Sequence, residues 1–371
     1  MTNAEQTPDL PVVEDVRSLW GLDLRPAGCP KCKQVHLVRE NQAEQLCPHC
    51  GGANLKPQPA LLRRDPPEMV LPFMRKPADL TAILTGFTKD VWLHTDSFTP
   101  EAMLRRAVPV FWPMWLVDGD VTGTWKAEVG FNYEVKSSQE AYGSAGWQTQ
   151  ERIETRIRWE PRAGQIQRHY DNIPIYAISN FNSMSALVGD FNLQAAVPYT
   201  PAAVGSAMIR LPDKKKDDAS LTVENAFIKR SEADCYRAAA AQHARNFRLN
   251  AQYPNQNWTQ LLMPLYVTFY LDDEGVPQMV LINGQSGQIG GPRLASQKKG
   301  WEMAGMVAAA GGILLILAFI CMMLSVVFPP AAVICILLGL LGFAVLLGAI
   351  VPAAWPSQWN RSQRELKVYK A

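Results

Sequence analysis

Apolar and charged positions are unevenly distributed along this chain of 371 residues. Residues 303–360 contain no Asp, Glu, Lys or Arg, although these types make up 19% of the sequence. Pro329 and Pro330 interrupt the run, and proline stops a helix. The pieces on either side, 303–327 and 331–354, are each longer than the ~20 residues that cross a bilayer. The pattern predicts two transmembrane helices joined by a tight turn, a helical hairpin over residues 301–355.

Basic residues flank this predicted hairpin on both sides, and its turn carries no charge. The positive-inside rule therefore places both termini in the cytosol and the helices in the inner membrane, with residues 356–371 as a basic tail. The first 16 residues have neither a basic start nor an apolar stretch, so we expect no signal peptide and a cytosolic soluble part. The residues used are Arg293, Lys298, Lys299, Arg361, Arg364, Lys367 and Lys370, with Trp301, Trp355 and Trp359 expected in an interfacial aromatic belt.

Small residues recur at four-residue spacing within both predicted helices. Ala304, Ala308 and Gly312 lie in the first helix, and Ala344 and Gly348 lie in the second. This spacing predicts close contact between the helices there, unless it reflects only the general frequency of small residues in membrane helices.

The soluble part predicts an α+β fold with antiparallel strands. We expect a flexible segment over 1–27, a zinc ribbon over 28–55, a linker over 56–76 and one α+β domain over 77–300. Asp79 and Thr99 are candidate caps of two short helices, and residues 221–245 have the composition of a long helix.

Three stretches predict strands. Residues 108–129 are rich in β-branched and aromatic types. Residues 152–160 alternate strictly between charged and apolar positions, and residues 161–164 predict a turn that pairs them with 165–170. Residues 272–275, of sequence DDEG, predict a second hairpin between two apolar stretches.

Four of the seven cysteines form two CxxC pairs, Cys29–Cys32 and Cys47–Cys50, that enclose fourteen residues. Each CxxC turn directs two sulfurs toward one point, and two such turns form a tetrahedral site suited to Zn²⁺. All four ligands come from the protein, so we expect one structural Zn²⁺ per chain with no open catalytic position. The alternative is free or redox cysteines.

The neighbours of these cysteines refine the prediction. Gly51 follows the last cysteine and permits a knuckle turn, whereas Lys33 occupies the equivalent position in the first pair. His36 and His49 are alternative ligands, and we expect both at the surface. The ribbon combines few basic residues with no aromatic residue, which weakens a nucleic-acid interpretation.

The sequence contains no Walker loop, no HExxH motif and no nucleophile elbow. The glycines near Gly284 and Gly287 are interpreted as a turn, because no helix pattern follows them. Two short stretches place titratable residues close together, and a hydrolase or metal site could use them: Asp118, Asp120, His169 and Asp171. The alternative is that these are ordinary strand-end and turn residues. We therefore predict a protein without a catalytic site.

The order of the segments resembles a known group of proteins. A four-cysteine ribbon is followed by "VLPF", "VPVFWPMWLVDGDVTGTW", "WEPRAGQIQRHYDNIPIYA", "FNLQAAVPYTP", "LLMPLYVTFYLDDEGVPQMVLINGQSGQIGG" and membrane helices. This order is similar to that of prokaryotic membrane-anchored zinc-ribbon proteins, some labelled helicase-like or primosomal on the ribbon alone. The resemblance implies association with phage-shock-protein-A-like (PspA-like, ESCRT-III-like) or SPFH/flotillin-like proteins in membrane stress, and only the four cysteines match its functional positions.

Together these features predict a non-enzymatic membrane-anchored adaptor or scaffold that docks a protein partner at the cytoplasmic face. The alternatives are a membrane-tethered nucleic-acid-binding protein and an enzyme with an unrecognised active site. The sequence leaves open a homo- or hetero-oligomer, and whether the basic tail binds anionic lipid.

Overall fold

The computed structural model describes residues 20–39, 42, 44–58, 66–143, 146–179, 186–214, 216–325 and 330–368. The chain divides into two compact units. Unit 1 comprises residues 1–113, 180–211 and 262–371, and unit 2 comprises 114–179 and 212–261. This division differs from the single domain expected over 77–300, because two long strands, β5 (Val108–Gly143) and β10 (Asn257–Leu271), each contribute to both units.

Unit 1 is built on a mixed sheet in the order β12-β11-β10-β5-β8-β2-β1-β3. The expectation of antiparallel strands holds for most neighbours, but β8 is parallel to β5. The further strands of unit 1 are β1 (Arg25–Gly28), β2 (Val35–Val38), β3 (Lys56–Pro57), β4 (Met69–Val70), β7 (Val197–Pro198), β8 (Met208–Arg210), β11 (Pro277–Asn283) and β12 (Ile289–Gly290).

The ribbon is part of this sheet and is continuous with the rest of unit 1. Strand β2 pairs with β8, so that His36 lies opposite Arg210 and Leu37 opposite Ile209. Residues preceding the ribbon also enter the fold: Trp20, Leu22 and Leu24 are buried in one core cluster. The flexible segment expected over 1–27 is therefore incorrect from residue 20 onward, and residues 1–19 lie outside the described residues.

Short helices cover the sheet of unit 1. A 3-10 turn, η2 (Pro77–Asp79), leads into α2 (Leu80–Thr88), and Asp79 accepts a hydrogen bond from the Lys76 N–H at the start of that turn. Thr99 caps α3 (Pro100–Arg105) as predicted, because its hydroxyl accepts from the Ala102 N–H. Unit 1 also contains the 3-10 turn η3 (Leu193–Ala195) and α5 (Pro201–Val204).

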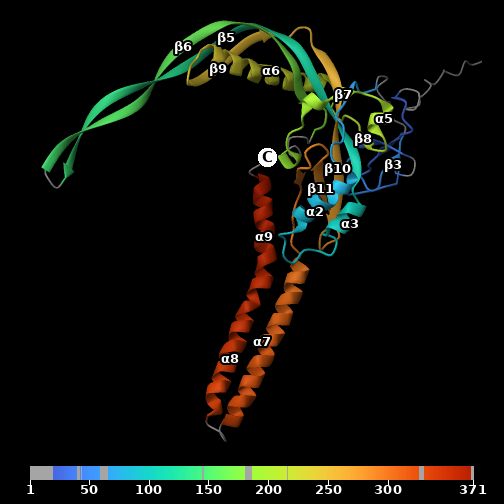
Figure 1. The fold of residues 1–371 in the computed structure, drawn as a ribbon, viewed down its shortest axis with the longest axis vertical. Helices are drawn as coiled ribbons and strands as arrows, with labels where there is room; N and C mark the ends of the chain where they lie inside the picture. The colour runs from blue at the N-terminus through green and yellow to red at the C-terminus, as the bar shows by residue number, and fades with distance from the viewer. Residues whose placement is uncertain are drawn as a thin grey trace, which may run out of the picture. The chain divides into compact units, whose positions relative to one another are not determined.

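Unit 2 consists of a long two-stranded hairpin, here called the β5–β6 hairpin, together with a third strand and one helix. Residues 114–143 of β5 pair with β6 (Gly146–Tyr176), and β9 (His243–Gln252) pairs with the other edge of β5. Helix α6 (Lys216–Ala238) packs against β6 and β9 and lies under the curved β5–β6 hairpin in Figure 1. Its buried face, which includes Val223 and Phe227, completes a core with Trp115, Val121 and Tyr170.

Two predictions for unit 2 were wrong. The hairpin expected at residues 161–164 does not form, because β6 continues through Pro161, which lies opposite Glu128 of β5. The helix expected over 221–245 begins earlier and ends at Ala238, and residues from His243 onward pair with β5 as β9. In both cases pairing with a distant strand overrides the local pattern. The hairpin at Asp272–Gly275, between β10 and β11, is confirmed.

The C-terminal part of unit 1 contains two long apolar stretches. Helix α7 (Gln297–Ser325) is followed by α8 (Ala331–Gly348) and α9 (Ile350–Val368), and α7 and α8 lie side by side (Figure 1). Residues 297–324 and 332–363 are each long and apolar enough to cross a membrane. The turn predicted at 328–330 falls mostly on residues outside the description.

Of the small residues predicted at the contact between the apolar helices, Ala304 is buried, but the other positions of the seam differ from the prediction. A Cβ on Gly311 would lie 2.9 Å from Leu346 Cγ and 3.0 Å from the Gly342 carbonyl oxygen. By contrast, a Cβ on Gly312 or Gly348 would meet nothing within 4 Å. The seam, meaning the line of close contact along α7, therefore follows Ala304, Gly311 and Ala318. Both alanines are buried. The spacing of seven residues keeps all three positions on one helix face.

Candidate metal centre

Two short turns of unit 1 hold the four cysteines. The first connects β1 to β2, where the Lys33 N–H donates to the Cys29 carbonyl (2.9 Å). In the second, the Gly51 N–H donates to the Cys47 carbonyl (2.9 Å). The two turns thus have the same backbone hydrogen bond at the same position, as two matched knuckles require.

The four sulfurs converge on one point. Their Sγ atoms all lie within 4.8 Å of one another, and the Cys29–Cys50 and Cys32–Cys47 pairs are each 3.7 Å apart. A tetrahedron with Zn–S bonds of about 2.3 Å has edges of about 3.8 Å, so the spacing fits a tetrahedral metal ion. Cys29, Cys32, Cys47 and Cys50 can therefore bind a metal, as the sequence predicted.

Burial differs among the ligand residues. Cys29 and Cys47 are buried, whereas Cys32 and Cys50 are half-buried. Burial raises the pKa of Cys32 to about 11 and raises the pKa of Cys47 as well. These two thiols are protonated at neutral pH in the metal-free site, so a metal ion must displace their protons to bind.

The residue after each second cysteine adopts a left-handed conformation. Lys33 has φ +62° and Gly51 has φ +58°. Glycine adopts this region without steric cost, whereas lysine does not. A Cβ on Gly51 would also lie 2.7 Å from Met279 Sδ, so this knuckle packs directly on β11. The lysine in the first knuckle is thus accommodated at a cost in backbone energy.

A buried arginine connects the second knuckle to the sheet. Arg210 on β8 is fully buried, and its guanidinium donates to His49 Nδ1 (3.0 Å) and to Gln34 Oε1 (3.0 Å). Its guanidinium also lies 5.8 Å from the centre of the Trp112 ring. Because His49 lies between Cys47 and Cys50, this network fixes the position of the second knuckle.

The prediction that both histidines of the ribbon lie at the surface is wrong for His36, and His49 is half-buried. His36 is fully buried beside Arg210, and neither ring nitrogen has a hydrogen-bond partner among the described residues. Burial, together with the positive charge of Arg210, lowers the pKa of His36 to about 3, so its ring is neutral. Sequence reasoning missed Arg210, although a single charge among Met208, Ile209 and Leu211 is a detectable signal of a buried polar network.

The titratable residues of unit 2 come together only in part. His169 Nδ1 lies 2.6 Å from Asp120 Oδ1, and His169 Nε2 lies 3.0 Å from Asp171 Oδ1. The Asp118 carboxylate instead accepts from the Asn172 N–H. The side chains of His169 and Asp171 are 51% and 71% exposed, so this cluster lacks the exclusion of water that usually accompanies acid–base chemistry.

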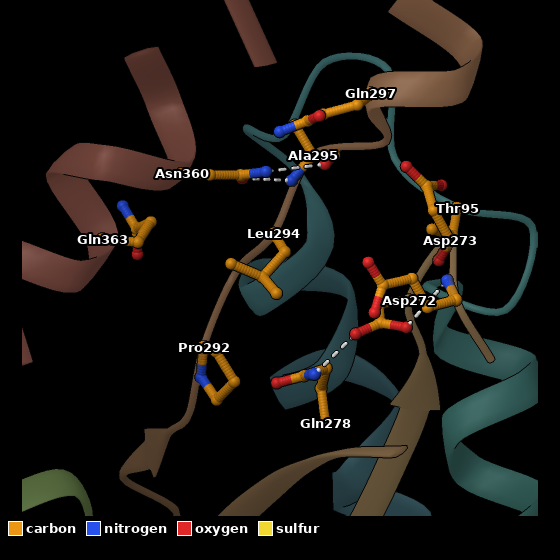
Figure 2. A pocket seen from close by; sticks show the side chains of 11 residues that line it. Thr95, Asp272, Asp273, Gln278, Pro292, Leu294, Ala295, Gln297, Asn360 and Gln363 are labelled. Atoms are coloured by element: carbon orange, nitrogen blue, oxygen red, sulfur yellow. Dashed lines mark hydrogen bonds between the residues drawn. The ribbon is translucent and has the colours of Figure 1, made fainter. Parts of the chain in front are cut away.

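A cavity of about 400 Å³ lies beside the C-terminal half of α9, which contributes Asn360 and Gln363 to its lining (Figure 2). The Asp272 carboxylate on its wall accepts hydrogen bonds from the Glu274 N–H and from Gln278 Nε2, and therefore orders the β10–β11 turn. On the opposite wall, Asn360 bonds both the N–H and the carbonyl of Ala295. These polar groups join α9 to the segment before α7.

The predicted belt tryptophans Trp355 and Trp359 also contact this part of unit 1. Trp359 Nε1 donates to the Arg293 carbonyl (2.6 Å), and the Trp355 ring packs on Trp92. Both indoles are partly buried against the core cluster that includes Leu84 and Phe98. Trp301, by contrast, is 67% exposed.

No family model matches the chain, and no match was found among curated proteins or solved structures.

Proposed function

We propose that this chain is a membrane-anchored zinc-ribbon protein whose metal centre is structural. The ion is Zn²⁺, because a tetrahedral set of four thiolates favours zinc in proteins. With four protein ligands, the ion has no open position for water or substrate, so the centre braces the fold.

Helices α7 and α8 are proposed to cross the inner membrane, with both termini in the cytosol. Their outward side chains are large and apolar: Ile313, Ile316 and Phe319 of α7 are 59%, 61% and 63% exposed. Hydrocarbon is the solvent that removes such a surface from water. The basic flanks set the orientation. A C-terminal reporter found outside the cytoplasm would contradict it.

The observation that carries the proposal is the attachment of these helices to the unit that contains the four cysteines. Asn360 and Trp359 join α9 to the residues preceding α7, and α7–α9 belong to the same compact unit as the ribbon. Whatever binds the ribbon is therefore held at the membrane. This arrangement supports an adaptor that recruits a protein partner, and the resemblance noted above points to a PspA-like or SPFH-like protein.

A groove next to the second knuckle is the proposed docking surface. The groove has a volume of about 210 Å³ and combines an apolar floor with two arginines. Arg105 is the last residue of α3, and Arg106 directly follows it. The floor includes Val267 and Met279, while Arg105 is exposed at the rim. We call this the ribbon groove: Gln45, Leu46, Cys47, Pro48, Arg105, Arg106, Val108, Val267, Phe269 and Met279.

The charges of the ribbon groove define its occupant. Arg106 is already engaged, because it donates to the Phe269 carbonyl (3.4 Å) and lies 5.0 Å from the centre of that ring. Arg105 is exposed at the rim, where it can pair with a carboxylate. The occupant is therefore a short partner segment with an apolar side chain beside an acidic one.

Co-purification of the full chain from native membranes in mild detergent tests the proposal. Wild-type protein is expected to retain a partner that Arg105→Glu loses, because the variant places an acid against the partner's acid. Lys89→Glu, an equal charge change at the exposed end of α2, is the matched control and should retain the partner. A partner retained equally by all three proteins, or robust turnover without any partner, would contradict the proposal.

A further inference from the structure

One edge of the β5–β6 hairpin of unit 2 carries a pattern of charges that is complementary to the same edge in a second, antiparallel copy. Residues 152–160 of β6, here called the β6 edge, pair on one side with residues 129–137 of β5. Within the described part of the chain, no strand pairs with their other side. The presence of Pro161 next to this stretch agrees with an edge strand, since proline lacks the N–H that a central strand needs.

The faces of the β6 edge are largely uncovered up to Ile157, whereas Trp159 is half-buried beneath the Arg245 guanidinium, which lies 4.0 Å from the centre of its ring. The β6 members of the unit 2 core all lie between Ile166 and Ile175, and β9 pairs with β5 only as far as Gly130. Beyond that point the β5–β6 hairpin has two strands, and an isolated two-stranded hairpin is marginally stable in water. Ile153 is 59% exposed and Ile157 is 39% exposed. Natural proteins seldom leave such an edge without protection or a partner.

The charged positions of the β6 edge share one face. Glu154 contacts Arg156 (3.4 Å), and Arg158 contacts Glu160 (3.0 Å), two residues apart in each case. These ion pairs are exposed, so each contributes little to stability and can be exchanged for a better one. The order along this face is Arg152, Glu154, Arg156, Arg158 and Glu160.

We propose that the β6 edge pairs with the β6 edge of a second copy of this chain, antiparallel and about a twofold axis at Arg156. In this register Arg152 faces Glu160 of the partner, and Glu154 faces Arg158 of the partner. By symmetry each opposite-charge pair occurs twice. Only Arg156 faces its own copy.

The other face supports the same register. Ile153 lies opposite Trp159 of the second copy, and Ile157 lies opposite Thr155, so each exposed isoleucine gains a cross-strand neighbour. Joining the β5–β6 hairpins of the two copies gives four strands in the order β5, β6, β6 and β5. The outer two-stranded part then gains the third and fourth strands that it lacks.

Neighbouring registers fit less well. A twofold axis at Ile157 puts Arg152 opposite Arg162, Glu154 opposite Glu160 and Arg156 opposite Arg158, which places like charges in every pair. An axis at Arg158 restores opposite charges but brings Pro161 into the ladder, where its missing N–H leaves a carbonyl unpaired. The charge pattern and the proline together select Arg156.

Charge exchange in the full chain, purified in mild detergent, tests this pairing. Glu154→Arg alone and Arg158→Glu alone each place like charges opposite one another at two symmetry-related positions. We expect each to weaken dimerisation roughly tenfold or more, as measured by light scattering or ultracentrifugation. The double variant Glu154→Arg/Arg158→Glu restores opposite charges and is expected to recover the wild-type dissociation constant. Lys136→Glu, exposed on β5 opposite Ile153, is the matched control.

Cysteine crosslinking tests the axis directly. Residues directly opposite in antiparallel strands have Cα atoms about 4.5–5.5 Å apart, which is within the range of a disulfide. Under mild oxidation Arg156→Cys should therefore form a covalent dimer, whereas Lys136→Cys should not.

Three outcomes would overturn the pairing. These are a wild-type chain that is monomeric at tens of micromolar, a dimer that survives both single reversals, and single-variant losses that the double variant does not restore. Zinc content and the ribbon-groove partner are independent of these results, so failure here is distinguishable from failure of the proposed adaptor role.

Discussion

The ribbon and the apolar helices, both in unit 1, hold their cysteines in opposite ways. The four ribbon cysteines have free thiols that converge on a metal-sized space. In the helices, Cys321 of α7 and Cys335 of α8 form a disulfide, with Cα atoms 5.5 Å apart. A chain in a reducing cytosol is expected to keep its cysteines reduced or bound to metal, and the helix pair departs from that expectation.

The surrounding interactions differ as well. The ribbon is ordered by polar contacts, in which one buried arginine bonds His49 and Gln34. The helices are ordered by close backbone approach, in which Gly311 meets the Gly342 backbone. A short segment in water needs a metal ion and a polar network, whereas two helices with apolar outer faces need a seam that allows tight packing.

Loss of the metal should have the largest effect. Cys47→Ser removes one of four ligands from a ribbon that has little core of its own, and structural zinc supplies on the order of 10 kcal/mol in isolated zinc fingers. We expect about one zinc per chain in the wild type and loss of both metal and ribbon structure in the variant. Metal analysis and thermal unfolding measure the two effects.

Cys235→Ser is the matched control, since Cys235 is a buried cysteine on α6 of unit 2. It should leave the zinc content unchanged. Zinc should also dissociate as the pH falls, because the raised pKa values of Cys32 and Cys47 mean that protons compete for the thiolates. A metal-free chain with an intact ribbon would show that the metal is not needed.

Loss of the buried arginine should come next. Arg210→Met keeps much of the side-chain volume but removes the guanidinium that donates to His49 and Gln34. A hydrogen bond from a charged donor contributes ~1.5–3 kcal/mol, so we expect a loss of about 2–4 kcal/mol in the free energy of unfolding. Arg39→Met, at an exposed arginine of the ribbon, should cost less than ~0.5 kcal/mol. Equal effects of the two variants would mean that burial of Arg210 is unimportant.

The seam between the helices provides a sharper pair of variants. Gly311→Leu forces a side chain against Leu346 and the Gly342 carbonyl, and overpacking costs ~1–3 kcal/mol. Gly312→Leu adds the same atoms at the next position, where a Cβ meets nothing within 4 Å, and should be nearly neutral. Thermal loss of the helical circular dichroism signal in detergent measures both. The reverse order of stability would support the contact first predicted at Gly312.

The metal centre and the apolar helices were predictable because each depends on a local pattern. The spacing of Cys29, Cys32, Cys47 and Cys50 fixes which sulfurs converge, and a charge-free run of residues marks the helices. The helix seam was only partly predictable. The four-residue spacing included Ala304 but not Gly311, since several faces of an apolar helix carry small residues and only packing selects one.

The strands of unit 2 were less predictable because long-range pairing decided them. Residues 161–164 contain turn-forming types, yet β6 continues through them because β5 supplies a partner over their whole length. Similarly, the end of the helix expected over 221–245, from His243 to Arg245, forms the start of β9 against β5. The ribbon's place in the sheet depends on β8, more than 160 residues from β2, and no local pattern carries that information.

The smallest expected effect compares the two knuckles with each other. Lys33 and Gly51 share a left-handed conformation, which costs a non-glycine residue ~1–2 kcal/mol. Lys33→Gly relieves that cost and adds ~0.5–1 kcal/mol of chain entropy to the unfolded state. The zinc-bound protein should therefore gain roughly 0.5–1 kcal/mol in stability, which chemical denaturation at saturating zinc can resolve. Gly51→Ala should have the opposite sign, because it adds the backbone cost and a contact with Met279. If both variants destabilised the ribbon, Lys33 would have a role that its backbone conformation does not explain.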